Sequence, residues 1–146
     1  MKKYKKSRIN TFFIEMIIVI LFFSIASTIV VEVFAKTNYD IKVNKIKSKC
    51  ITKSNAIGDL YSSNMDVAKT LVRIFGDDCE IFMDGNDNYI LNLDDNLLAN
   101  GESDVVYKIC EARKQTKAGY MGELKISCIY NNEVIYESEC GAYISN

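Results

Sequence analysis

One stretch decides how the rest of this chain can fold: TFFIEMIIVILFFSIASTIVV, residues 11–31. It contains no proline, glycine or basic residue, and its single charged side chain is Glu15. A helix needs about 20 predominantly apolar residues to cross the hydrocarbon core of a bilayer. The stretch therefore predicts a membrane-spanning helix over residues 11–34, close to the amino terminus.

Glu15 is the most informative residue of this predicted span. An ionised carboxylate at the bilayer centre costs roughly 2.5 to 3.5 kcal/mol even on the mildest scale, so such residues usually have a function and a partner. Near the amino-terminal end of a helix the cost is smaller, because the helix dipole favours negative charge there. Two interpretations therefore stay open: a residue with a binding role, and an ordinary interfacial residue.

The charge of the chain is distributed unevenly. Of 18 basic residues, five lie in a head over residues 1–10: Lys2, Lys3, Lys5, Lys6 and Arg8. From Lys36 onward the chain has 13 basic and 17 acidic residues. Positive charge favours the cytoplasmic side of a membrane, so we expect a cytoplasmic head and an exported domain over residues 35–146. No net basic charge remains on the exported side, which disfavours nucleic-acid binding.

Beyond the span, apolar residues recur in steps of three and four, with Lys53 as an exception. Helices that bury one face have this spacing. The stripe consists of Tyr39, Val43, Ile46, Cys50, Ile57 and Leu60. With no proline in the chain, the spacing predicts one helix over residues 11–61, of which residues 35–61 belong to the exported domain.

A second, shorter helix is expected over residues 65–75. Ser62, Ser63 and Asn64 are typical of a turn and a helix cap, and Gly76 is typical of a left-handed stop. From residue 79 to residue 140 the apolar period changes to two, which indicates strands. Turn residues divide this region, including Asn131 and Asn132. The sequence thus predicts an α+β fold with an antiparallel meander of about five strands.

Five cysteines would all lie on the exported side, where disulfides form. An odd number leaves at least one thiol unpaired. Histidine and CxxC motifs are absent, which disfavours a zinc site. We expect disulfides within the carboxyl-terminal strands, among Cys79, Cys110, Cys128 and Cys140.

The composition does not favour an enzyme. Without histidine or a glycine-rich phosphate loop, the usual nucleophile and base arrangements cannot be recognised, so no catalytic residue or cofactor is expected. Asp84, Asn86, Asn88 and Asp95 match part of a calcium-loop pattern. Tyr89 stands where that loop requires glycine, so a hairpin turn is the preferred interpretation and no metal is expected.

The segment FFIEMIIVI, residues 12–20, resembles the amino-terminal helix of type IV pilins and their pseudopilin relatives. In that family a peptidase removes a short basic leader, and the apolar helix carries glutamate at its fifth mature position and often methionine at the sixth. Alignment on Glu15 and Met16 makes Thr11 the first mature residue and Asn10 the residue before the cut. The family usually has an aromatic residue and glycine there, so the chain departs from the pattern at this site.

The resemblance implies a bacterial single-pass membrane protein that assembles into a type IV pilus or a type II secretion-like filament at the cell surface. Its expected partners are the lipid bilayer, other pilin-like subunits, an inner assembly platform and a prepilin peptidase. In the family the glutamate neutralises the amino terminus of a neighbouring subunit. In an uncut chain Glu15 would instead need Arg8, Lys6 or a partner protein.

A second interpretation is a small secreted or membrane-tethered binding domain whose amino terminus serves only for export. Val33, Phe34 and Ala35 fit the small-residue requirement of signal peptidase, and cleavage there would leave Lys36 as the first residue. The apolar run is longer than the 7 to 15 residues usual in a cleaved signal peptide. It also contains Glu15.

Overall fold

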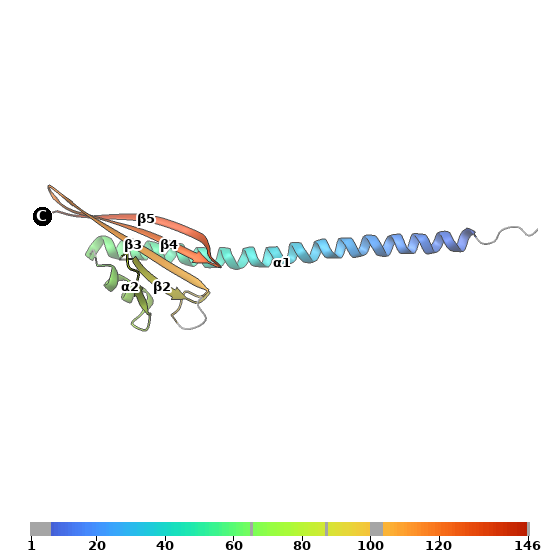
Figure 1. Ribbon diagram of the computed structural model, residues 1–146, viewed down its shortest axis with the longest axis horizontal. Coiled ribbons are helices and arrows are strands. Elements are labelled where there is room, and N and C mark those ends of the chain that lie inside the picture. Colours follow the sequence, from blue (N-terminus) through green and yellow to red (C-terminus); the bar gives the residue numbers. More distant parts are fainter. Residues whose placement is uncertain (1–6, 65, 87, 100–103, 146) are drawn as a thin grey trace, which may run out of the picture. The chain divides into compact units, whose positions relative to one another are not determined.

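The computed structural model describes residues 7–64, 66–86, 88–99 and 104–145. The chain divides into two compact units, Met1–Ile41 and Lys42–Asn146. Figure 1 shows the order of the elements, with two helices followed by the strands of one sheet. The fold is α+β, as the sequence predicts. The four lysines of the predicted head and Asp87 lie outside the described residues.

Helix α1, Ser7–Asn64, contains 58 residues. Its length follows from composition, because the chain has no proline and Gly58 is the first glycine. The predicted turn at residues 62–64 is wrong, since these residues still belong to α1. Ser62 donates to the carbonyl of Gly58 at 2.7 Å and Ser63 to that of Leu60 at 2.8 Å, so both hydroxyls bond inside α1. The cap of the next helix is a different residue, because Ser62 and Ser63 lie inside α1.

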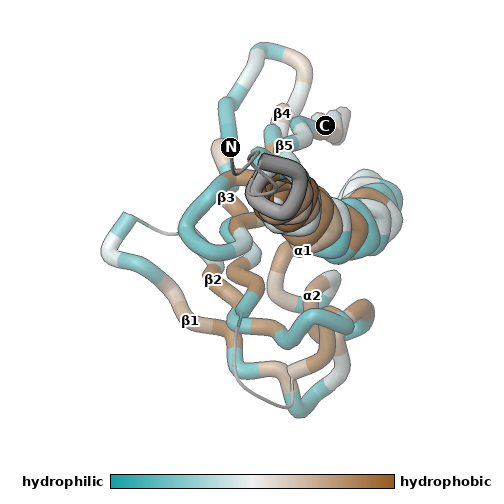
Figure 2. The backbone as a smooth tube through the Cα atoms, turned by 90° about the vertical axis from the view of Figure 1, so that its right-hand side faces the viewer, coloured by the Kyte–Doolittle hydropathy of each residue, from teal (hydrophilic) through white to brown (hydrophobic). Residues whose placement is uncertain are grey.

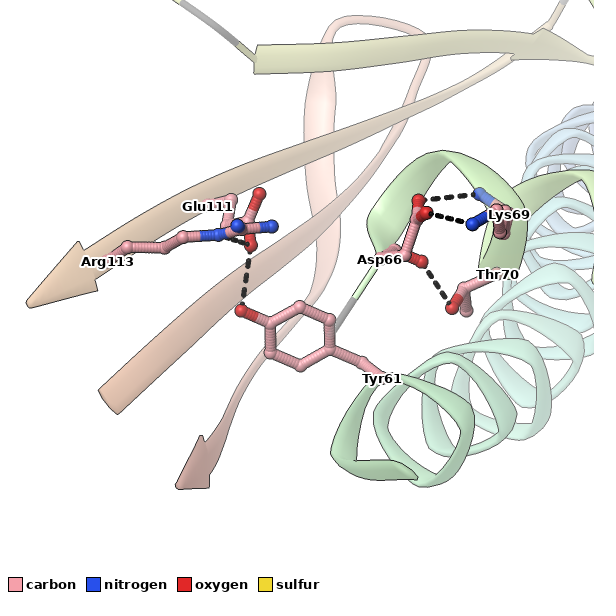
Figure 3. Close-up of polar contacts among 6 residues, drawn as sticks. All are labelled: Tyr61, Asp66, Lys69, Thr70, Glu111 and Arg113. Atoms are coloured by element: carbon pink, nitrogen blue, oxygen red, sulfur yellow. Dashed lines mark hydrogen bonds and ion pairs between the residues drawn. The ribbon is translucent and has the colours of Figure 1, made fainter. Parts of the chain in front are cut away.

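Helix α2, Val67–Phe75, is capped by Asp66 instead. The backbone N–H of Lys69 donates to the Asp66 carboxylate at 3.0 Å, and the hydroxyl of Thr70 donates to the Asp66 carbonyl at 2.7 Å (Figure 3). The first of these bonds, with the Lys69 side chain, lowers the pKa of Asp66. At the other end Gly76 has φ +93°, which glycine adopts without strain, and its N–H donates to Val72.

All strands belong to one antiparallel sheet with the order β1-β2-β3-β4-β5. The strands are β1 Ile81–Met83, β2 Asn88–Leu93, β3 Val105–Thr116, β4 Gly119–Tyr130 and β5 Glu133–Ser145. Each strand pairs with its sequence neighbour, as expected for a meander. Asn131 and Asn132 have φ values of 50° and 64°, which confirms the predicted turn between β4 and β5.

The core of the second unit lies between one face of the sheet and the helices. Figure 2 shows the sheet with α2 and the end of α1 on the same side of it. Alternate strand residues point to this face, which we call the inner face. Those of β3 and β4 are buried: Val105, Tyr107, Ile109, Leu124, Ile126, Cys128 and Tyr130. Neither of the two helices of the described residues lies on the opposite, outer face of the sheet.

A disulfide joins Cys50 of α1 to Cys128 of β4, with the two Cα atoms 6.7 Å apart. The expectation of pairing within the strands is therefore wrong. Cys128 is on the inner face, whereas Cys110 pairs with Lys125 in the sheet and points to the outer face. Cys140 shares the inner face but lies four residues along β5 from Tyr136, the partner of Cys128, or about 13 Å away. The sulfur within bonding distance of Cys128 is that of Cys50, which belongs to the buried stripe on α1.

Candidate functional site

The predicted span on α1 exposes its apolar side chains all around the helix. From Phe12 to Val31 the large apolar residues have exposed fractions between 48% and 72%. Within the described part of the chain, α1 is the one helix long and apolar enough to cross a membrane. A surface of this kind stays out of water only against lipid or against other helices.

Hydroxyl groups inside the apolar run are satisfied by the helix itself. Ser24 donates to the carbonyl of Ile20 at 2.9 Å, and Thr28 donates to that of Ser24 at 3.0 Å. Thr37 donates in the same way to Val33 at 2.8 Å. Polar groups in a bilayer must find internal partners, so these bonds make the segment compatible with a lipid environment.

Glu15 lies on this exposed surface together with the other residues of the predicted assembly site. Thr11 and Glu15 are one helical turn apart and share a face, and Met16 is 48% exposed. Asn10 belongs to α1, but its side chain lies outside the described residues. No other described residue bonds to the Glu15 carboxylate. The site thus consists of one carboxylate among apolar side chains, which can accept hydrogen bonds or bind a cation of another molecule.

The apolar stripe of α1 divides between the two units. In the second unit Ile46, Cys50 and Ile57 are buried, while Val43 and Leu60 are half-buried. Tyr39 belongs to the first unit and is 44% exposed. Tyr61 is also fully buried, although the apolar stripe did not predict it, and it continues the stripe one residue further.

Lys53, the exception in the stripe, is half-buried and contacts α2. Its ammonium group donates to the carbonyl of Ile74 at 2.9 Å and lies 4.9 Å from the centre of the Phe75 ring. Unpaired carbonyls at the end of a helix attract positive charge, and aromatic faces do so too. Lys53 therefore attaches the end of α2 to α1.

A polar cluster holds the end of α1 on the sheet. The hydroxyl of Tyr61 donates to the carboxylate of Glu111 at 2.9 Å, and Arg113 donates to the same oxygen at 2.6 Å (Figure 3). The Glu111 side chain is only 12% exposed, so its charge needs these two donors. Burial, and next the bond to Glu111, raise the pKa of Tyr61 to about 12. The tyrosine therefore stays protonated and keeps donating across the physiological range.

Tyr107 makes a second link between helix and sheet, inside the core. Its hydroxyl donates to the carbonyl of Cys50 at 2.8 Å and lies 3.4 Å from the hydroxyl of Ser54. Burial raises the pKa of Tyr107 to about 12. Together with the disulfide at Cys50, this bond fixes the register of α1 on β3 and β4.

The loop after β2 is bound to α1 by two lysines. Lys42 forms an ion pair with Asp95 at 2.6 Å, and Lys49 donates to the side chain of Asn96 at 2.8 Å. The bond to Asp95, and next that to Tyr130, raise the pKa of Lys42. Asp95 was the last position of the partial calcium pattern, and its carboxylate is thus engaged with a cation of the chain. Lys42 and Lys49 are two helical turns apart and so share one face of α1. This spacing was the only sequence signal for their contact with the loop after β2.

Three cysteines are free: Cys79, Cys110 and Cys140. Burial raises the pKa of the thiols of Cys79 and Cys140, which keeps them in the unreactive protonated form. Across residues 7–145, apart from those left undescribed, no three His, Cys, Asp or Glu side chains are close enough to hold a metal ion.

The geometry of the described residues thus supplies a helix with an exposed apolar surface and one carboxylate, followed by a well-packed α+β unit. Comparison with protein-family models, with curated proteins and with solved structures finds no match to this chain.

Proposed function

We propose that this chain is a pilin-like or pseudopilin-like subunit, anchored in a bacterial cell membrane by the first part of α1 and assembled through the same segment. In this proposal the head is cytoplasmic and the second unit is extracellular. The filament is a type IV pilus or a type II secretion-like filament. The protein acts by assembly and not by catalysis.

The observation that carries the proposal is Glu15 within the exposed apolar surface of α1. The carboxylate lies among side chains such as Phe12 and Val19, which are 59% and 54% exposed. In a bilayer or a bundle of apolar helices, a charge is stable only when another group neutralises it or donates to it. A cationic amine on a neighbouring subunit would satisfy Glu15 and fix the register between the two helices.

The second unit supports the proposal as a compact domain of its own. The disulfide between Cys50 and Cys128 and the bond from Tyr107 to the Cys50 carbonyl hold the sheet on the part of α1 that belongs to this unit. Such a domain would remain folded outside the membrane while the first part of α1 takes part in assembly.

The test replaces the carboxylate with its neutral isostere, Glu15→Gln, in the native host. We expect normal membrane insertion and at least a tenfold loss of the protein from the assembled fraction, measured by immunoblotting of membranes and of sheared surface material. Glu32→Gln is the matched control, because Glu32 is also exposed on α1 but follows the apolar run. Normal incorporation of Glu15→Gln would contradict the proposal.

Processing is tested by the intact mass of the protein from its native host. A product that begins at Thr11 fits cleavage after Asn10 and supplies a free amine as the natural partner of Glu15. A full-length product fits an uncut subunit, in which Arg8, Lys6 or another protein would neutralise the carboxylate. A product that begins at Lys36 contradicts the assembly proposal, because it lacks Glu15.

The alternative candidate is a small extracellular binding domain, secreted or tethered, with an amino-terminal export signal. One observation favours it: the second compact unit begins at Lys42, after the Val33-Phe34-Ala35 motif, so cleavage there would keep this unit whole. A soluble product in the culture medium that begins at Lys36 would support this function.

A further inference from the structure

Strand β5 forms a long edge of the sheet that the chain leaves open. The opposite edge, β1, has three residues, whereas β5 has 13. Glu137, Glu139, Gly141 and Tyr143 of β5 are exposed. An open edge presents unpaired N–H and C=O groups to another strand, and proteins usually protect such edges with proline, lysine or bulges.

Those protections are missing over most of β5. The strand contains neither proline nor lysine. The one irregularity of its pairing with β4 lies at Cys128 and Ile129, beside the start of β5. From Tyr136 to Tyr143 the strand follows β4 in regular register, so it offers a straight template for pairing.

A hollow of about 470 Å³ lies beside this edge on the outer face of the sheet. Its floor includes the small side chains of Cys110 and Ala112 on β3. Glu123 and Lys125 of β4 and Glu139 of β5 also line it. In the register Glu123 of β4 stands between Ala112 and Gly141, so a side chain that enters from the β5 edge first meets the Glu123 carboxylate.

Gly141 opens the hollow toward the free edge. It is the cross-strand partner of Glu123 and has no side chain to separate the hollow from the edge. A Cβ added to Gly141 would meet only the carbonyl oxygen of Gly122, at an ordinary 3.7 Å. The glycine is therefore not required by crowding, and its effect is to leave a passage.

On the outer face the lining of the hollow has a small excess of negative charge, with Glu123 and Glu139 against Lys125. Glu123, Glu137 and Glu139 lie on the outer face near two lysines, Lys114 and Lys125. The distances in these ion pairs are 3.5 to 3.8 Å, and all the partners are substantially exposed. Such pairs are weak, so the carboxylates remain available to a further cation.

We propose that the free edge of β5 binds an extended segment of another protein, which adds to the sheet as a further strand and inserts a lysine or arginine across Gly141 into the hollow. Cross-strand partners point to the same face, so the residue opposite Gly141 faces Glu123 and Glu139. Backbone pairing supplies affinity and the acidic hollow supplies selectivity, as in other cases of strand addition.

A second copy of this chain fits this edge poorly. Its own β5 carries Glu133, Glu137 and Glu139, and its other edge, β1, is flanked by Glu80 and Asp84. Neither edge contributes a cation. The partner is thus a different protein with a basic extended segment, and the inference does not depend on the function proposed above.

The test measures binding of a fluorescent peptide to the full-length protein in detergent micelles. The peptide is as long as β5, alternates threonine and valine, and has one arginine at its centre. We expect saturable binding by fluorescence anisotropy, at least tenfold weaker when glutamate replaces the arginine. Methylation of alternate peptide nitrogens, which removes donors on one side of the strand, should abolish binding for one of the two methylation patterns.

Two variants examine the hollow itself. Gly141→Val should fill the passage and weaken binding at least tenfold, with little change in melting temperature because the added Cβ makes only an ordinary contact with the carbonyl oxygen of Gly122. Glu139→Lys should weaken it similarly. Gly85→Val, at a glycine with nothing within 4 Å, is the matched control and should bind normally. Equal binding of both methylated peptides, normal binding by Gly141→Val, or concentration-dependent dimers that exclude the peptide would each overturn the proposal.

Discussion

The two parts of α1 have the same helical backbone and opposite surroundings. In the first unit Ile17 is 62% exposed and Ile25 is 52% exposed. In the second unit Ile46 and Ile57 are buried under the sheet, at 2% and 0%. The same residue type on one helix is thus exposed in one part and belongs to the core in the other.

The difference shows what each part of the helix requires. The second part is satisfied within the chain, by the disulfide at Cys50, the bond from Tyr61 to Glu111 and the contact of Lys53 with α2. In the first part the hydroxyls of Ser24 and Thr28 donate to carbonyls of the same helix, and the apolar side chains are exposed. Stability therefore depends on the second unit, and localisation is expected to depend on the first.

The largest expected effect comes from placing the same charge in both parts. Ile57→Asp buries an unpaired carboxylate and should destabilise the second unit by more than about 4 kcal/mol, measured by urea unfolding of the full chain in micelles. Ile17→Asp should leave that unfolding curve unchanged and reduce membrane insertion, measured by carbonate extraction. Equal unfolding by both variants would remove the distinction between the two parts.

Loss of the disulfide should have the next largest effect. The crosslink spans 78 residues, and removing it in a Cys50→Ala, Cys128→Ala variant should lower the free energy of unfolding by about 4 kcal/mol. Reduced wild-type protein should match the variant, and membrane association should not change. Cys110→Ala, at a free thiol on the outer face, is the control. A crosslink that left stability unaltered would show that noncovalent packing alone holds α1 on the sheet.

The smallest effect concerns pH. Burial raises the pKa of Tyr61 to about 12, above its ordinary value of about 10, so folding favours the protonated phenol. Its contribution is complete below pH ~10 and is lost as pH rises to about 12, by roughly 2–3 kcal/mol. Tyr61→Phe should therefore show a shallower loss of stability over this window, followed by urea unfolding at each pH. Identical slopes for variant and wild type would contradict the assignment.

The sequence was sufficient where local rules act alone. The absence of proline predicts the continuity of α1, and Asn131-Asn132 predicts the turn between β4 and β5. Alternation predicts the strands of the carboxyl-terminal half. The predicted end of the last strand was wrong, since β5 extends to Ser145 and not to residue 140. Backbone pairing with β4 extends β5 beyond Gly141, and the local sequence pattern does not indicate this pairing.

Predictions failed where the partner comes from a distant part of the chain. Lys53 breaks the apolar stripe because its ammonium group meets the end of α2, which is 21 residues away in sequence. Cys50 finds Cys128 only after the helix lies on the sheet. Asp66, and not Ser62 or Ser63, caps α2 because α1 continues to Asn64 and the two serines lie within it.

The candidate assembly site was found from one charge in an apolar run, and its exposed position on α1 agrees with that reasoning. Its role stays a prediction, because the partner of Glu15 would belong to another molecule. The edge of β5 and its hollow were not predicted. The register places the small residues Ala112 and Gly141 on either side of Glu123 in one cross-strand row, which the sequence alone does not show.

The bond between Cys50 and Cys128 also has a mechanical consequence. If the chain were stretched between its amino and carboxyl ends, tension would pass from residue 50 directly to residue 128. Residues 51–127, with α2, strands β1 to β3 and most of β4, lie inside the loop that the disulfide closes and would not be extended. Extension under force would then come only from the chain outside this covalent shortcut. On the sheet side β5 would be the first strand to peel away, and most of the domain would remain intact under a pull that releases its last strand.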